Sequence, residues 1–230
     1  MASLSEIIYD ELTTIKGSGR FSDDNMIPIE QLEYLNINNR SYLIRQDQNK
    51  GRSLSDNITQ VLPCVEVVSV STSECPCNVE IDCTILRTKN RIPRPIELFQ
   101  KDLITRVSGA DMTGKGWSII SFARASVAGS NNLTSQTPKA FLHDGYVYIL
   151  FAPAGIKYIS ISLVAEDPRE AASFANCSGG VCYTNDMPFP ISNYMIPLLK
   201  EMVLKDLKIE ITVPVDYKGD EKSKGEPQSS

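Results

Sequence analysis

The amino-acid sequence predicts an α+β fold with N-terminal helices, a mainly antiparallel β core, a C-terminal amphipathic helix and an extended tail. Apolar residues recur at helical spacing near both ends of the chain, and they alternate with polar residues through its middle. An Asp-Gly pair also separates two β-prone runs. We expect a helical segment at residues 1–62, a β-rich core at 63–166, a helical segment at 167–208 packed against the first, and an extended or disordered tail at 209–230.

Two helices are expected in the N-terminal segment. Apolar residues at positions 4, 7, 8, 12 and 15 follow a helical period, and the glycines at 17 and 19 end it. The second helix is expected from Pro28, which suits a first helical turn, to about Asp47. It is rich in Asn, which lowers helix propensity, so we expect its stability to come from packing against another element.

The β core is predicted from three alternating segments. Val79–Ile85 and Tyr158–Val164 have the period of half-buried strands. Phe141–Ile149 is predicted to form a hairpin, because Asp144-Gly145 accommodates the positive φ angles of a two-residue turn. The polar stretch 126–139 is expected to be an exposed loop.

Helical periodicity returns after the β core. A short helix is expected at about residues 170–175, and a longer amphipathic helix at 193–207 has its apolar residues at 195, 199, 202 and 203. Residues 209–213 alternate like a strand. Residues 216–230 are charged and lack apolar periodicity, so disorder is the expected state.

Composition limits the classes of function. The chain has 230 residues, of which 42% are apolar and 22% charged, as in an ordinary globular protein. Its apolar runs are too short to span a bilayer, and its first ten residues lack the pattern of a secretory signal. The formal net charge of −5 argues against a broad phosphate-binding surface, because nucleic-acid binding needs clustered Lys and Arg.

No catalytic residue is predicted, and we expect that the protein is not an enzyme. His143 is the one histidine in the sequence, and no serine lies in the strand–turn–helix motif of a hydrolase nucleophile. Its place beside the predicted turn favours a structural role. The glycine-rich segments lack the spacing of a phosphate-binding loop, so they are interpreted as turns.

The cysteines allow two interpretations. Four of the six lie within twenty residues and could hold zinc tetrahedrally: Cys64, Cys75, Cys77 and Cys83. Paired zinc ligands usually have two residues between them, whereas Cys75 and Cys77 have one. A disulfide framework is not expected in a reducing compartment. We therefore favour reduced cysteines that pack as small apolar side chains and expect no cofactor, with zinc as the alternative.

Basic residues are enriched between the predicted helices and the first strands: Lys50, Arg52, Arg87, Lys89, Arg91 and Arg94. No aromatic residue is interleaved with them, so stacking on single-stranded bases is poorly supported. We expect a solvated face or a surface that meets an acidic neighbour.

Several long strings resemble structural proteins of crAss-like phages. They are RQDQNKGRSLS at residues 45–55, LPCVEV at 62–67, CTILRT at 83–88, IPRPIEL at 92–98, KDLITRV at 101–107 and PIS at 190–192. The resemblance runs over about residues 40–210. These strings are long and idiosyncratic, so they are more specific than any short motif in the chain.

The resemblance implies a ring or adaptor subunit beneath the portal of a short-tailed phage. It implies a dodecameric ring around the DNA exit channel, with the portal and other tail or ring proteins as neighbours and genomic DNA passing without specific binding. It also implies residence in the virion after assembly in the host cytoplasm, with no membrane contact and no catalytic residue.

We expect the assembly interface to include Asn36, Asn39, Arg45, Arg52, Ile209, Ile211 and Val213. The main alternative is a zinc-stabilised protein-binding module. A small hydrolase is disfavoured, because the sequence has no pattern that joins a nucleophile to a base.

Overall fold

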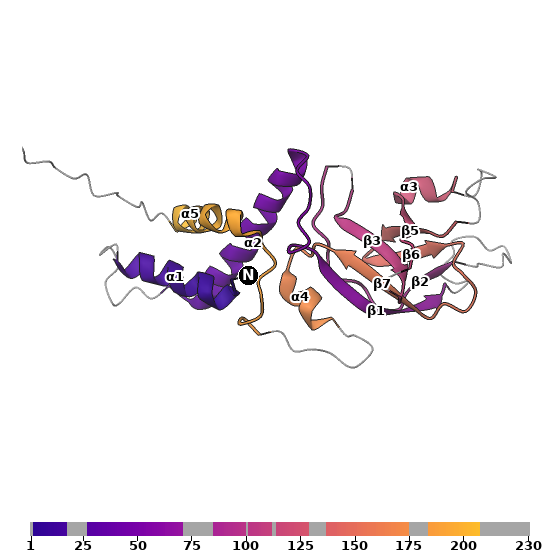
Figure 1. Ribbon diagram of the computed structural model, residues 1–230, viewed down its shortest axis with the longest axis horizontal. Helices are drawn as coiled ribbons and strands as arrows, with labels where there is room; N and C mark the ends of the chain where they lie inside the picture. Colours follow the sequence, from indigo (N-terminus) through magenta and orange to yellow (C-terminus); the bar gives the residue numbers. More distant parts are fainter. Residues whose placement is uncertain are drawn as a thin grey trace, which may run out of the picture.

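The computed structural model describes residues 2–17, 27–70, 85–99, 101–111, 114–128, 137–174 and 184–207. The molecule is elongated, with its three longer helices toward one end and a curved sheet toward the other (Figure 1). The α+β prediction is confirmed. The predicted strand at 79–85 lies outside the described residues except for its last position, and the predicted tail at 209–230 lies outside them entirely.

Helix α1 (Leu4–Gly17) forms where the apolar period predicts it. Its predicted apolar face is buried at Leu4, Ile7, Ile8 and Ile15. Ser3 and Glu6 form a reciprocal cap at the start of the helix. The Ser3 backbone N–H donates to Glu6 Oε2 at 3.0 Å, and the Glu6 N–H donates to Ser3 Oγ at 3.1 Å. Two N–H groups that the first turn leaves without helical partners are thereby satisfied.

Helices α2 (Ile29–Asn49) and α5 (Ile196–Asp206) complete the helical part, and both are predicted by the sequence. A short 3-10 helix, η1 (Asn193–Met195), leads into α5. Leu199, Val203 and Leu204 of α5 share one buried core with apolar residues of α1 and α2. The apolar stripes of the three helices therefore cover one another.

Among the described residues, seven strands form one sheet. They are β1 (Gln60–Ser69), β2 (Leu86–Thr88), β3 (Ile104–Gly109), β4 (Ser118–Ile119), β5 (Lys139–His143), β6 (Tyr146–Leu150) and β7 (Tyr158–Leu163). Their order is β3-β7-β1-β2-β6-β5-β4, and every pair is antiparallel except β4 with β5. The two edge strands approach each other, because Trp117 N–H just before β4 donates to the Val107 carbonyl of β3 at 2.7 Å. The sheet therefore curls toward a barrel around a second apolar core.

The β5–β6 hairpin confirms the predicted turn. Asp144 has φ 50° and Gly145 has φ 79°, the positive values at both central positions of a type I′ turn. The turn fixes the register in which Phe141 lies opposite Tyr148 and His143 opposite Tyr146. One face of the hairpin is therefore aromatic.

Two short helices flank the sheet, α3 (Phe122–Ala125) and α4 (Pro168–Ser173). Helix α4 begins two residues before the predicted start at 170. The Asp167 side chain caps it by accepting from the Arg169 backbone N–H at 2.8 Å, and Pro168 occupies the first turn. The predicted loop at 126–139 is described only at its ends, a turn after α3 and the first residue of β5.

A fully buried arginine joins the helical part to the sheet. Arg40 of α2 is 0% exposed, and it donates from Nε to the Pro190 carbonyl at 2.7 Å and from Nη1 to the Ala165 carbonyl at 2.9 Å. Its guanidinium also lies over the ring of Phe189, 5.7 Å from the centroid. Three segments that are far apart in the sequence are therefore held by one side chain.

Candidate functional site

Two of the residues expected at an assembly interface lie inside the subunit. Asn36 is 0% exposed, and its Nδ2 donates to Glu11 Oε2 at 2.8 Å and to the Leu32 carbonyl at 2.9 Å. Asn39 is also buried, and its Nδ2 donates to Asp206 Oδ2 of α5 at 2.8 Å. Helices α1 and α5 of the same chain thus supply the packing that the Asn-rich helix requires, so our reason for placing these two residues at an interface no longer holds.

The two arginines of that expected interface remain at the surface. Arg45 pairs with Glu166 at 2.9 Å, and Arg52 pairs with Asp47 at 3.1 Å. Their side chains are 38% and 58% exposed, so both are accessible to solvent despite these ion pairs. The remaining three positions, Ile209, Ile211 and Val213, lie outside the described residues.

Cys64 corrects the expectation of reduced cysteines, because it is disulfide-bonded. A sulfur in a disulfide is not a thiolate, so Cys64 is not a zinc ligand in this state. The other candidates, Cys75, Cys77 and Cys83, lie outside the described residues. The part of the chain that the structure describes contains no group of three or more His, Cys, Asp or Glu side chains placed to hold a metal.

The buried Glu11 is the most strongly perturbed titratable group that the structure describes. Burial raises the pKa of its carboxyl from 4.5 to about 7, although the hydrogen bond from Asn36 favours the charged form. Glu11 Oε1 and Asn36 Oδ1 are buried without a hydrogen-bond donor. A proton on Glu11 removes the cost of a buried charge, so this pair makes the helical core sensitive to pH.

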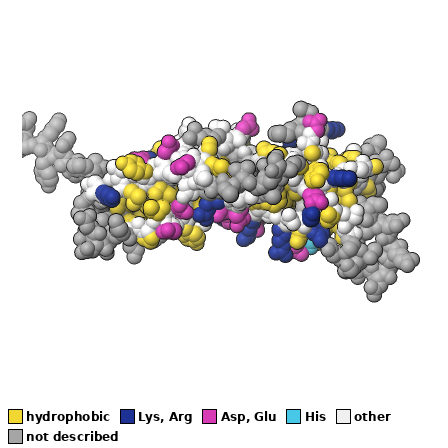
Figure 2. Space-filling view, turned by 90° about the horizontal axis from the view of Figure 1, so that it is seen from below, with side chains coloured by type: hydrophobic (Ala, Val, Ile, Leu, Met, Phe, Trp, Pro, Cys, Tyr) yellow, Lys and Arg dark blue, Asp and Glu magenta, His cyan; other side chains and the backbone are white. Residues whose placement is uncertain are grey.

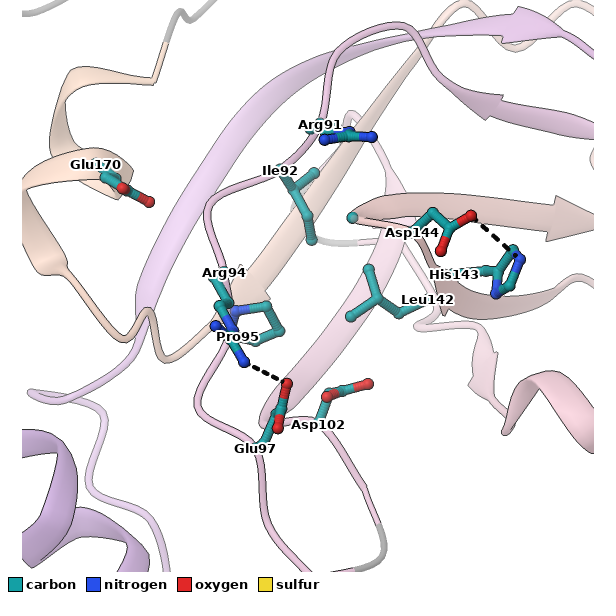
Figure 3. Close-up of a pocket in the computed structure, with 11 residues that line it drawn as sticks. Arg91, Ile92, Arg94, Pro95, Glu97, Asp102, Leu142, His143, Asp144 and Glu170 are labelled. Atoms are coloured by element: carbon teal, nitrogen blue, oxygen red, sulfur yellow. Dashed lines mark hydrogen bonds and ion pairs between the residues drawn. The ribbon is translucent and has the colours of Figure 1, made fainter.

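An open cleft of about 540 Å³ lies between the hairpin turn, the segment before β3 and helix α4 (Figure 3). Its charged lining is mixed: Arg91, Arg94, Glu97, Asp102, Asp144 and Glu170. Arg94 pairs with Glu97 at 2.9 Å and with Glu166 at 3.4 Å. Burial, together with the nearby Glu97 carboxylate, raises the pKa of the Asp102 carboxyl. Because these charges partly cancel one another, the cleft has no strong preference for either sign.

His143 lies at the edge of this cleft without a nucleophile. Its Nε2 is 3.5 Å from Asp144 Oδ2, and its ring stacks on Phe122 with 4.1 Å between centroids. Within the described residues, no Ser or Cys side chain is hydrogen-bonded to it. The geometry agrees with the structural role that the sequence favours.

The basic stretch was expected to be a solvated face or a surface that meets an acidic neighbour, and two of its arginines lie over an aromatic ring. The Arg87 guanidinium lies 4.5 Å from the centroid of the Tyr146 ring, and that of Arg91 lies 5.6 Å from it. Strand β2 pairs with β6, which brings this tyrosine beside arginines that are more than fifty positions away in the sequence. We call Arg87, Arg91 and Tyr146 the arginine–tyrosine face.

Figure 2 shows Lys and Arg side chains gathered beside the histidine, with Asp and Glu side chains both among them and nearer the middle of the visible surface. No helix among the described residues is both long and apolar enough to cross a membrane.

Comparison with known proteins defines the class of this α+β subunit. The chain is similar to Ring protein 2 of Bacteroides phage crAss001, with 28% identity over 223 residues, which cover 89% of each chain. That relative is a phage ring protein. Residues 6–224 match the family described as phage tail ring protein 2, and the chain belongs to this family. The resemblance to structural proteins of crAss-like phages is confirmed.

Proposed function

We propose that this chain is a structural subunit of the phage head-to-tail connector or tail ring and assembles below the portal around the DNA exit channel. The family match over residues 6–224 carries the proposal, because it includes both the helical part and the sheet. The proposed state is a homo-oligomeric ring, a dodecamer, assembled in the host cytoplasm and retained in the virion. Ring closure requires heterologous contacts, in which two different surfaces of each subunit meet.

We propose the portal and other tail or ring proteins as the neighbours of this ring. Arg45 and Arg52 are proposed to contribute to assembly, since both side chains are exposed at the end of α2. Ile209, Ile211 and Val213 are proposed to add a strand-like segment to a neighbour. The subunit is proposed to work without turnover and without a cofactor.

The size of the purified protein tests this proposal. Mass photometry of the full chain, alone and mixed with the portal protein, should give a closed ring of twelve subunits that binds the portal. Electron microscopy of the same samples should show a central channel. A protein that stays monomeric in both samples would overturn the proposal.

Weak binding of duplex DNA is a second expected outcome. The chain has a formal net charge of −5, so few phosphates would be neutralised and few counterions released. Fluorescence anisotropy at physiological salt should show no submicromolar complex. Tight binding with a steep salt dependence would contradict the passage of DNA without specific contacts.

A further inference from the structure

We infer that the ring contact pairs the arginine–tyrosine face of one subunit with a carboxylate patch on the helical part of the next copy. The inference rests on the proposed function, because a closed ring of identical subunits needs two different complementary surfaces. It assigns those surfaces, and three observations carry it.

The first observation is the state of Arg91, because Arg87 beside it already donates from Nη1 to the Thr88 carbonyl at 3.3 Å. A guanidinium stacked on an aromatic ring keeps its in-plane N–H groups available for a carboxylate, which it binds through two parallel hydrogen bonds. Arg91 is exposed, and no carboxylate among the described residues forms an ion pair with it. Stacking on Tyr146 also restricts its motion before a partner binds, so less entropy is lost on association.

The second observation is an aromatic extension of the same sheet face. His143 lies opposite Tyr146 in the hairpin, and Phe122 stacks on His143 while remaining 56% exposed. The arginines therefore lie beside apolar surface that a partner would cover. Arginine and aromatic side chains are the residue types enriched at protein interfaces.

The third observation is the carboxylate patch, which we define as Glu30, Glu33, Asp167 and Asp186. Arg169 pairs with Glu33 at 3.1 Å and with Asp167 at 2.9 Å.

Other contacts hold the rest of the patch together. The Asn185 side chain donates to Glu33, which places the neighbouring Asp186 at the same surface. Glu30 lies one turn before Glu33 on α2, and both Glu30 and Asp186 are exposed. Two carboxylates of the patch are therefore paired with Arg169, and the other two are exposed, with Asp186 accepting from Ser5 Oγ at 2.9 Å.

The formal net charge of the sheet region differs from that of the rest of the chain, and the difference has the sign that this contact requires. Residues 60–166 contain ten Lys and Arg against nine Asp and Glu, whereas the rest of the sequence contains thirteen against nineteen. The formal net charges are +1 and −6. The patch lies around α4 and the start of α2, whereas the arginine–tyrosine face lies on β2, β6 and the segment after β2, across the cleft that Arg91 and Glu170 of α4 both line (Figure 3). A second copy is therefore the partner whose charge fits.

Two charge-reversal variants test the pairing. Arg87→Glu/Arg91→Glu reverses the charge of one surface, and Glu30→Lys/Asp186→Lys reverses that of the other. Each variant alone should need at least about tenfold more protein to form rings, as expected when exposed ion pairs at each contact are replaced by like-charge repulsion. The matched controls Lys101→Glu/Lys115→Glu and Asp56→Lys/Glu201→Lys change the same charges at exposed positions elsewhere and should assemble like the wild type.

Mixing the two variants gives a sharper readout. The reversed face of one variant is acidic and the reversed patch of the other is basic, so the mixture regains a complementary pair at every contact. It should therefore form alternating rings that neither variant forms readily alone, and mass photometry measures them directly. The milder Arg87→Gln/Arg91→Gln variant, checked by thermal melting, keeps the test valid if the reversal impairs folding.

Each outcome has a distinct meaning. Wild-type rings together with unimpaired rings of both reversal variants would overturn the pairing and leave the proposed function intact. If the wild type forms no ring, the proposed function itself fails. Arginine variants that assemble normally but lose binding to duplex DNA would show that this face contacts nucleic acid, and would also overturn the inference.

Discussion

Replacing Glu11 with Gln should make the stability of this protein much less dependent on pH near neutrality. Glu11 is 0% exposed in the helical core, and burial raises its pKa from 4.5 to about 7. The folded state therefore holds a proton that the unfolded chain releases at lower pH. The contribution of Glu11 to the free energy of unfolding is most favourable below pH 4.5. It is lost as the pH rises from 4.5 toward 7.

The size of the effect follows from the two pKa values. A difference of 2.5 units between 4.5 and about 7 corresponds to about 3 kcal/mol of unfolding free energy above pH 7. Between pH 5 and pH 8 the wild type should lose about 2.5 kcal/mol through this group alone. A glutamine has no charge to bury, and its amide N–H can serve the buried Asn36 Oδ1 that has no donor.

Urea unfolding at pH 5, 6, 7 and 8 measures the difference. The Glu11→Gln variant should be more stable than the wild type at pH 8, by up to about 3 kcal/mol, and close to it at pH 5. Glu30→Gln changes an exposed carboxylate on α2 and serves as the control for charge alone. Parallel stability curves for the wild type and Glu11→Gln would refute the reasoning, because Glu11 would then titrate like an exposed glutamate.

Three further predictions test the fold. Gly145→Val should lower the unfolding free energy in denaturant melts by about 1–3 kcal/mol, because a β-branched residue is strained at φ 79°; His143→Ala should cost less, and equal losses would contradict the turn argument. Arg40→Leu should lower it by about 2–4 kcal/mol, since two carbonyls lose their donors inside the protein; a melting temperature like that of the wild type would contradict the role of Arg40 in joining the two parts. Reduction should destabilise the wild type by about 2–4 kcal/mol more than it destabilises Cys64→Ser; alkylation with mass spectrometry measures the Cys64 disulfide, and its absence in the native protein would contradict the assignment.

Sequence patterns predicted the elements whose cause is local. The period of apolar residues located α1 and α5, and Asp144-Gly145 located the hairpin turn. The alternation in β7 correctly predicted that Ile159, Ile161 and Leu163 are buried. Each of these signals depends on backbone preferences within a few residues, so it can be identified from the local sequence alone.

Such local patterns predicted much less of the candidate site. Arg40 reads as an ordinary helical arginine, and only the fold places it against the carbonyls of Ala165 and Pro190. Asn36 and Asn39 were expected at an assembly interface, yet α1 and α5 of the same chain bury them and supply their partners. The family resemblance came from long strings rather than from any site geometry.

The sequence by itself determined the three longer helices, the β5–β6 hairpin with its turn, strand β7 and the family, because each of these is encoded over short or contiguous stretches. Only the tertiary structure decided that Arg87 and Arg91 lie over Tyr146 and that Glu11 is buried beside Asn36. These pairs depend on which strands become neighbours, in which register, and on which helix faces close together. Such choices are made by the burial of the whole apolar core, and no local pattern in the chain records them.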